Sequence, residues 1–282
     1  GTDPELFRTA DTVIGFEKEL AANQTIALTI EYAYPEGGEM GAFRLSCREP
    51  GEIPSAERAV ELAARADVAL IFAGLSSEWE SEGYDRLDMD LPGGQAGLIK
   101  AVAAANPRTV VVLNTGSAIH MPWLDDVAAV VQSWYGGQEL GNAVADVLFG
   151  DVNPCGKLPQ TFPARLEDNP AFLNYPGENG RVLYGEGLFV GYRYYEKKKI
   201  APLFPFGFGL SYTTFEIGNL RLSGAEMAPD GALHVSVDVT NTGGRAGKEV
   251  VQLYLRDAES RLVRPEKELK GFAKVALAPG ET

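Results

Sequence analysis

The pattern of hydrophobic and polar positions changes twice along the chain. Apolar and polar residues alternate with a period of two near both ends, which predicts β-strands, whereas apolar runs alternate with alanine-rich segments in the middle, which predicts strands and helices in turn. Strands near the ends are expected at 26–32, 43–47, 233–239 and 249–255, with another before the final turn at 277–282. In the middle, helices are expected over 55–65, 94–105 and 138–149, and strands over 67–73, 109–114 and 127–133.

The middle part has the pattern of an α/β domain. Its expected strands are nearly continuous apolar runs, which is typical of parallel strands covered by helices on both faces. The ligand of such a sheet binds at the carboxyl ends of the strands. The strand at 67–73 is followed almost at once by the acidic segment 76–90, so this segment is expected at the edge where a ligand binds.

These patterns divide the chain into four parts, and the fold class is multidomain, α/β plus β. Residues 1–49 contain two or three strands, too few for a stable sheet, so they are expected to complete a sandwich with other strands. Residues 50–150 form an α/β sandwich domain with a mainly parallel sheet. Residues 151–212 are rich in Pro, Gly and aromatic side chains, which indicates a connecting segment packed on the other domains. Residues 213–282 predict a β-sandwich module.

Composition and charge narrow the classes of partner. The 282 residues include 45% hydrophobic ones, as in ordinary globular proteins, and no apolar run approaches the roughly 20 residues of a membrane-spanning helix. The formal net charge is −14, and the largest basic cluster is Lys197–Lys199, which disfavours nucleic acids and anionic membranes as partners. Two cysteines far apart indicate no disulfide framework, and with only two histidines the zinc-binding spacings are absent. We expect no cofactor.

The acidic segment Ser76–Asp90 is the strongest candidate for chemistry. Crowded carboxylates raise one another's pKa, so that one of them could stay protonated near neutral pH and act as a general acid. A solvated acidic loop without function is the competing interpretation, and crowding alone does not decide between them. A calcium loop is disfavoured because Leu91–Pro92 replaces the continuation of an EF-hand. The six carboxylates of the segment are Glu78, Glu80, Glu82, Asp85, Asp88 and Asp90.

Several stretches resemble glycoside hydrolase family 3, of the β-glucosidase type, in its C-terminal half. The resemblance covers about residues 54–282, and it implies that the last module is a truncated fibronectin type III-like domain. Residues 1–49 resemble the last strands of the protective-antigen-like β-sandwich that some members carry as an insert. The stretches are GLSSEWESEGYDRLDMDLPG, VVLNTGSAIHMPWL, QSWYGGQELGNAVADVLFGDVNPCGKLPQTFP, YGEGLFVGYRYY and PLFPFGFGLSYTTF.

The resemblance implies a role for one residue of the acidic segment. Members of this family are retaining enzymes with a nucleophilic Asp on an N-terminal (β/α)8 barrel and an acid/base Glu on a loop of the α/β domain. A residue-by-residue match to Ser-Glu-Gly-Tyr-Asp-Arg puts the acid/base at Glu82, with Glu80 as the alternative because only one residue separates the two. Trp79 and Tyr84 are candidates for substrate contact, since aromatic faces suit the apolar face of a sugar ring.

The expected function is that of a retaining, exo-acting glycoside hydrolase that releases a terminal β-linked sugar from an oligosaccharide or glycoconjugate. The barrel with its nucleophile is absent from this chain, so the chain is expected to supply the acid/base loop and to be inactive without the barrel. One alternative is a non-catalytic carbohydrate-binding or structural fragment. Another is a β-xylosidase on the same scaffold.

Overall fold

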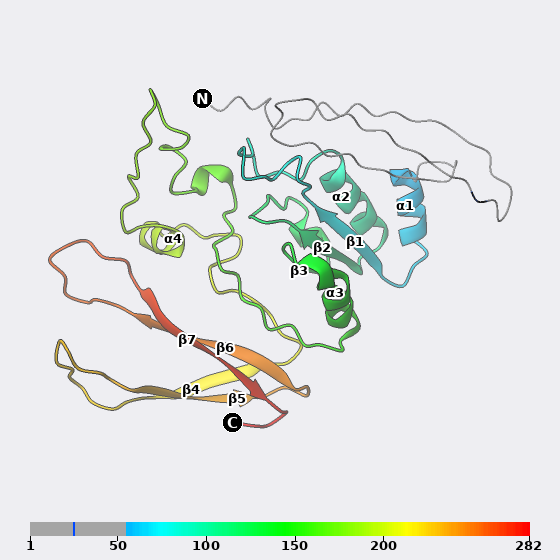
Figure 1. Cartoon of the computed structure of the whole chain (residues 1–282). Coiled ribbons are helices and arrows are strands. Elements are labelled where there is room, and N and C mark those ends of the chain that lie inside the picture. The colour runs from blue at the N-terminus through cyan, green and yellow to red at the C-terminus, as the bar shows by residue number, and fades with distance from the viewer. Residues whose placement is uncertain (1–24, 26–54) are drawn as a thin grey trace.

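The computed structural model describes residue 25 and residues 55–282. The strands expected at 26–32 and 43–47, and the sandwich strands assigned to 1–49, lie outside the described residues. The described chain forms an α/β domain followed by antiparallel β-strands (Figure 1).

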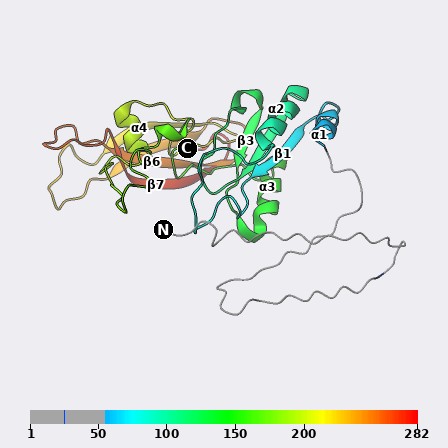
Figure 2. The ribbon, with the colours of Figure 1, turned by 90° about the horizontal axis from the view of Figure 1, so that it is seen from above.

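The α/β domain contains a three-stranded parallel sheet in the order β1-β2-β3. Helices α1 and α2 lie side by side on one face of this sheet and α3 lies on the other (Figure 2), which confirms the predicted parallel sheet with helices on both faces. The strands are β1 (Ala69–Gly74), β2 (Thr109–Asn114) and β3 (Ala129–Gln132), and the helices are α1 (Ala56–Ala63), α2 (Gln95–Ala105) and α3 (Leu140–Phe149).

Local sequence explains where these elements begin and end. Ser55 caps α1 as expected, since its side chain accepts a hydrogen bond from the Arg58 amide at 3.2 Å. Helix α3 is preceded by a 3-10 turn at Gly137–Glu139 and ends at Gly150, which adopts the left-handed conformation that glycine tolerates best. The strands fall within about two residues of their predicted positions because each is a continuous apolar run.

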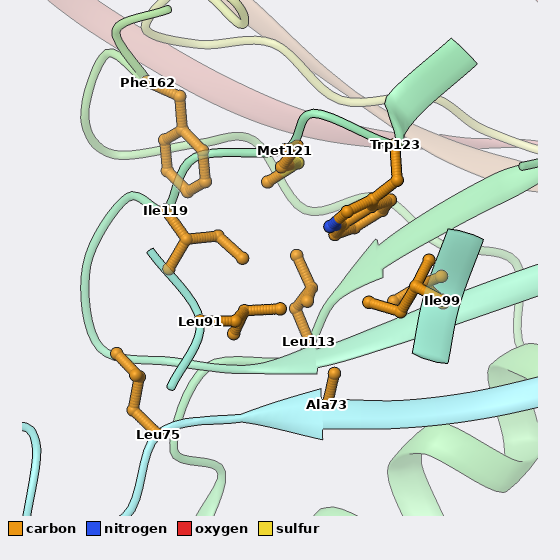
Figure 3. Packing of buried hydrophobic residues seen from close by; sticks show 10 residues of the cluster. Ala73, Leu75, Leu91, Ile99, Leu113, Ile119, Met121, Trp123 and Phe162 are labelled. Carbon is orange, nitrogen blue, oxygen red and sulfur yellow. The ribbon is translucent and has the colours of Figure 1, made fainter. Parts of the chain in front are cut away.

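The core lies between the sheet, α2 and the loops at the carboxyl ends of the strands (Figure 3). Leu75 and Leu91, at the two ends of the acidic segment, are both buried in it, as is Ile119 from the loop after β2. Phe162 joins the same cluster from the connecting segment and is only 1% exposed. The core therefore fixes both ends of the acidic segment and holds the connecting segment against the α/β domain.

Residues 151–212 are packed only in part, since Phe162 is buried whereas most side chains of residues 171–190 are exposed. They also contain a helix that the sequence pattern did not predict. Helix α4 (Tyr192–Lys198) has the sequence YRYYEKK, in which three tyrosines and four charged residues give no apolar stripe. It begins after Gly191 and ends at Lys199, which adopts the left-handed conformation. Lys197 and Lys198 lie in its last turn, where positive charge suits the helix dipole.

The last part of the chain forms two antiparallel strand pairs, which appear as two layers in Figure 1. The buried Asn241 links them, since its side chain donates to the Arg245 and Leu277 carbonyls at 2.7 and 3.1 Å and accepts from the Thr213 hydroxyl at 2.8 Å. The strands are β4 (Phe215–Leu222), β5 (Val235–Asn241), β6 (Gly247–Leu255) and β7 (Glu268–Leu277).

Candidate active site

The acidic segment leaves the carboxyl end of β1 and returns to α2. Gln95 at the start of α2 closes this loop: its side chain accepts from the Gly74 amide at 2.9 Å and donates to the Gly74 and Pro92 carbonyls at 3.0 and 3.2 Å. The segments that follow β2 and β3 reach the same edge of the sheet. The structure therefore brings three loops together at the edge where the sequence predicted a ligand site.

Glu80 is the carboxylate at which these three loops meet. Its Oε2 accepts hydrogen bonds from the Gly116 amide at 2.8 Å and from the Tyr135 hydroxyl at 2.6 Å, and its Oε1 accepts one from the Ser117 hydroxyl. Gly116 and Ser117 follow β2, and Tyr135 follows β3. We call these four residues the Glu80 clamp.

The clamp holds Glu80 in its ionised form. Partial burial raises the pKa of Glu80, but the three hydrogen bonds and, to a smaller extent, the charge of Arg86 outweigh it and lower the pKa below its usual value. Burial and the hydrogen bond to Glu80 raise the pKa of Tyr135 to about 12, so Tyr135 remains a donor at neutral pH. The expectation that crowding raises the pKa of these carboxylates is therefore wrong for Glu80, because burial is what raises its pKa and the donors from other loops outweigh that effect.

Arg86, the only cation of the segment, makes a second connection to the loop after β2. Its Nη2 donates to the Ser117 hydroxyl at 3.1 Å and to the Ala118 carbonyl at 2.8 Å. Ser117 therefore lies between Arg86 and Glu80 and contacts both. Both the anionic Glu80 and the cationic Arg86 therefore hold the acidic segment to the loop after β2.

Glu82 lies on a tight turn between Glu80 and Arg86. Ser81 and Tyr84 form an isolated antiparallel bridge around it, and the Gly83 amide donates to the Ser81 hydroxyl at 3.3 Å. The Tyr84 hydroxyl donates to the Ser77 carbonyl, which ties the turn back to the start of the segment. The Glu82 carboxylate is exposed, and within residues 55–282 no group donates a hydrogen bond to it or pairs with it.

Three of the other carboxylates also take part in hydrogen bonds or ion pairs. Asp85 accepts from the Tyr175 hydroxyl of the connecting segment, and Asp90 pairs with His120 at 2.9 Å. Asp88 accepts from the Asp90 amide at 2.9 Å. Among the described residues, the two carboxylates of the segment without a partner are therefore Glu82 and Glu78.

The structure separates the remaining candidates by exposure. Trp79 is exposed by 49%, which leaves much of its indole open to a ligand, whereas Tyr84 is half-buried and its hydroxyl is engaged. The sequence interpretation did not include Tyr135, Ser117 or Tyr175 in the site. Tyr135 could have been found from its place just after β3, because the carboxyl ends of parallel strands share one edge.

Clusters of metal ligands and membrane-spanning helices are both absent from the residues that the structure describes. In the part of the chain that the structure describes, no group of three or more His, Cys, Asp or Glu residues is arranged to hold a metal ion. None of the helices described there is long and apolar enough to cross a membrane.

Comparison with known families identifies the scaffold. Residues 12–212 match the glycosyl hydrolase family 3 C-terminal domain, which is well over half of the chain. The chain belongs to glycoside hydrolase family 3. Residues 249–282 match a fibronectin type III-like domain, as the resemblance implied. The predicted family and fold class are thereby confirmed.

Relatives within glycoside hydrolase family 3 extend this match. A β-glucosidase of Rhizobium radiobacter is 53% identical over 272 residues, which cover 93% of this chain and 33% of that protein. Thermostable β-glucosidase B of Acetivibrio thermocellus is 56% identical over 223 residues, 79% of this chain and 30% of that protein. The crystal structure of the Kluyveromyces marxianus β-glucosidase in complex with glucose superposes with a TM-score of 0.76 at 55% identity, over 80% of this chain and 26% of that one.

The chain spans about a third of the length of the curated relatives it matches. The remaining two thirds of those relatives have no counterpart in this chain.

Proposed function

We propose that this chain supplies the acid/base loop of a retaining, exo-acting glycoside hydrolase that releases a terminal β-linked glucose. The relatives carry the name β-glucosidase, and the solved structures include one in complex with glucose, which favours glucose over xylose as the sugar. The remaining half of the site, a nucleophilic Asp, would come from the N-terminal barrel that the family resemblance implies.

The single observation that carries the residue assignment is the different environment of Glu80 and Glu82. A general acid needs a carboxyl that binds and releases a proton and that can reach the substrate. Glu80 accepts three hydrogen bonds and has a lowered pKa, which favours a permanently ionised group. Glu82 is exposed and has no partner among the described residues, so its carboxyl is available to a substrate.

The mechanism assigns two successive tasks to Glu82. In the first step the nucleophilic Asp attacks the anomeric carbon, the glycosidic bond breaks, and Glu82 transfers its proton to the leaving oxygen. In the second step Glu82, now ionised, takes a proton from the water that attacks the glycosyl-enzyme ester, and the nucleophile is released. The two carboxyl groups of a retaining enzyme lie about 5 to 5.5 Å apart, so the barrel must approach the turn at Glu82 closely.

This function is tested by comparing the chain alone with the longer protein that includes the N-terminal region. The chain alone should not hydrolyse 4-nitrophenyl β-D-glucoside, because one carboxyl cannot perform double displacement. The longer protein should hydrolyse it with release of β-glucose first, observed by ¹H NMR of the anomeric proton. Turnover by the chain alone, or initial release of α-glucose, would overturn the proposal. Faster hydrolysis of the matching β-xyloside would favour a β-xylosidase.

Trp79 gives a second prediction about this site. Its half-exposed indole, next to the clamp, is proposed to stack on a sugar ring, and Tyr84 is proposed to contact the sugar with its ring because its hydroxyl is engaged with Ser77. In the longer protein, Trp79→Ala should raise KM by about two- to tenfold with kcat nearly unchanged, as expected for a contact made equally in ground and transition states. Trp79→Phe should retain most of the affinity. Equal KM values for all three proteins would remove Trp79 from the site.

A non-catalytic carbohydrate-binding role is the second candidate, and the exposed Trp79 is the observation that favours it. This role is tested by measuring sugar binding to the 282-residue chain without the N-terminal region. Saturable binding of cellobiose to the 282-residue chain, lost in Trp79→Ala, would support this role for the isolated piece.

A further inference from the structure

We propose that Glu80 is a positioning residue, which holds the turn bearing Glu82 in the geometry of an acid/base through its contacts with Gly116, Ser117 and Tyr135. The inference rests on the proposed function, since it concerns the residue that makes Glu82 effective. It assigns a task to the most strongly bound carboxylate of the acidic segment.

The clamp connects the ends of three strands through one side chain. Glu80 belongs to the segment after β1, its partners Gly116 and Ser117 belong to the segment after β2, and Tyr135 belongs to the segment after β3. Hydrogen bonds to an ionised acceptor are stronger than those between neutral groups. Glu80 therefore ties the acidic segment to the part of the domain whose position the core already fixes.

The fit around Gly116 shows how closely the clamp is assembled. A Cβ atom added at Gly116 would lie 2.8 Å from Cε2 of Tyr135 and 3.1 Å from Oε2 of Glu80. Both distances are shorter than ordinary van der Waals contact, so a side chain at this position would push the two partners apart. Glycine at position 116 is thus required by the close approach of its amide to Glu80.

The turn at Glu82 is held on both sides by such contacts. Glu80 precedes it in the clamp, and Arg86 follows it with hydrogen bonds to Ser117 and Ala118. Only five residues separate the two anchors, so the path of the turn is short. A general acid must lie within hydrogen-bond reach of the leaving oxygen, and a displacement of about 1 Å can cost roughly 100-fold in rate. Fixing both ends of a short turn is the means by which this chain would keep Glu82 in reach.

The first experiment examines the clamp in the 282-residue chain itself. Amide hydrogen exchange, followed by mass spectrometry over residues 76–86, should become at least tenfold faster in Glu80→Gln, Tyr135→Phe and Gly116→Ala. Glu80→Gln weakens every hydrogen bond to the carboxylate, and the other two variants disturb the contacts from Tyr135 and Gly116. The control is Glu78→Ala, an exposed carboxylate of the same segment without a partner among the described residues, which should exchange like the parent chain. Unchanged exchange in all three clamp variants would overturn the inference, whatever the enzyme does.

The second experiment measures the consequence in the longer, catalytically complete protein. In the clamp variants, kcat/KM for phenyl β-D-glucoside, whose leaving group needs a proton, should fall by about 10- to 100-fold. For 2,4-dinitrophenyl β-D-glucoside, whose leaving group needs none, it should change less than about threefold. A variant that merely loses folded protein would lower both values equally. Equal losses, or no loss relative to Glu78→Ala, would overturn the positioning role.

Azide separates this inference from the proposed function. The clamp variants retain Glu82 as a base, so added azide should give no β-glucosyl azide and no acceleration. If Glu80→Gln instead produces β-glucosyl azide while Glu82→Ala behaves like the parent enzyme, Glu80 is the acid/base, and both the residue assignment and the inference are wrong. If Glu82→Ala alone responds to azide and the clamp variants match the control, only the inference is wrong.

Discussion

Replacing Glu82 with Ala in the longer protein is expected to lower kcat/KM for phenyl β-D-glucoside by about 10²- to 10⁴-fold, the usual contribution of a general acid. The loss should be far smaller for 2,4-dinitrophenyl β-D-glucoside, because a good leaving group departs without protonation. With that substrate the glycosyl-enzyme should accumulate, since no base remains to activate water, so kcat should fall while KM falls with it. Steady-state kinetics with a series of aryl glucosides measures all three effects.

Added azide should restore turnover of the dinitrophenyl substrate in Glu82→Ala. The anion needs no general base, and it enters the space left by the missing carboxylate to attack the glycosyl-enzyme, which gives β-glucosyl azide by net retention. Glu78→Ala is the matched control, because Glu78 lies in the same segment and likewise has no partner among the described residues. Parent-like kinetics in Glu82→Ala, without the azide product, would remove Glu82 from the reaction.

The parallel sheet could be predicted from the sequence because its signal is local. Each strand is a short apolar run, and Ser55 marks the beginning of α1. Strand β4 and helix α4 could not be predicted in the same way. Most positions of β4 are exposed and its pairing with β5 is irregular between Gly218 and Arg221, so its residues do not alternate clearly. Tyr192 of α4 stacks on Phe206, which lies beyond the helix in the sequence, and a local pattern does not contain this contact.

The position of the acidic segment could be predicted, but the different environments of its carboxylates could not. The rule that ligands bind at the carboxyl ends of parallel strands placed the segment correctly. The partners of Glu80 come from residues 36 to 55 positions later in the chain, so their effect on its pKa depends on tertiary structure. Counting neighbouring charges predicted a raised pKa, whereas hydrogen bonds from Ser117, Tyr135 and Gly116 lower it. These donors outweigh the effect of burial on Glu80, and the neighbouring carboxylates repel it little because water screens charges near the surface.

The connecting segment is joined to the α/β core through Phe162, and this side chain gives the second large prediction. Phe162→Ala should lower the free energy of unfolding by about 3–5 kcal/mol, the usual cost of removing a buried phenyl ring. The ring packs edge-on against Trp134 and Phe204, with centroids 6.0 and 6.3 Å apart. The backbones of Phe162 and Phe204 also exchange hydrogen bonds of 2.8 and 3.2 Å, so the surrounding structure has little freedom to fill the cavity.

Urea unfolding followed by tryptophan fluorescence is the suitable measurement. All three tryptophans of the chain, Trp79, Trp123 and Trp134, lie in the α/β domain, so the signal reports this domain separately from the β-strands that follow. Leu173→Ala is the matched control, because Leu173 belongs to the same connecting segment but is 92% exposed, and its effect should stay within about 0.5 kcal/mol. A loss below about 1 kcal/mol for Phe162→Ala would mean that the connecting segment separates from the α/β core before the core unfolds. In that case Phe162 would not belong to the cooperative folding unit that includes the acidic segment.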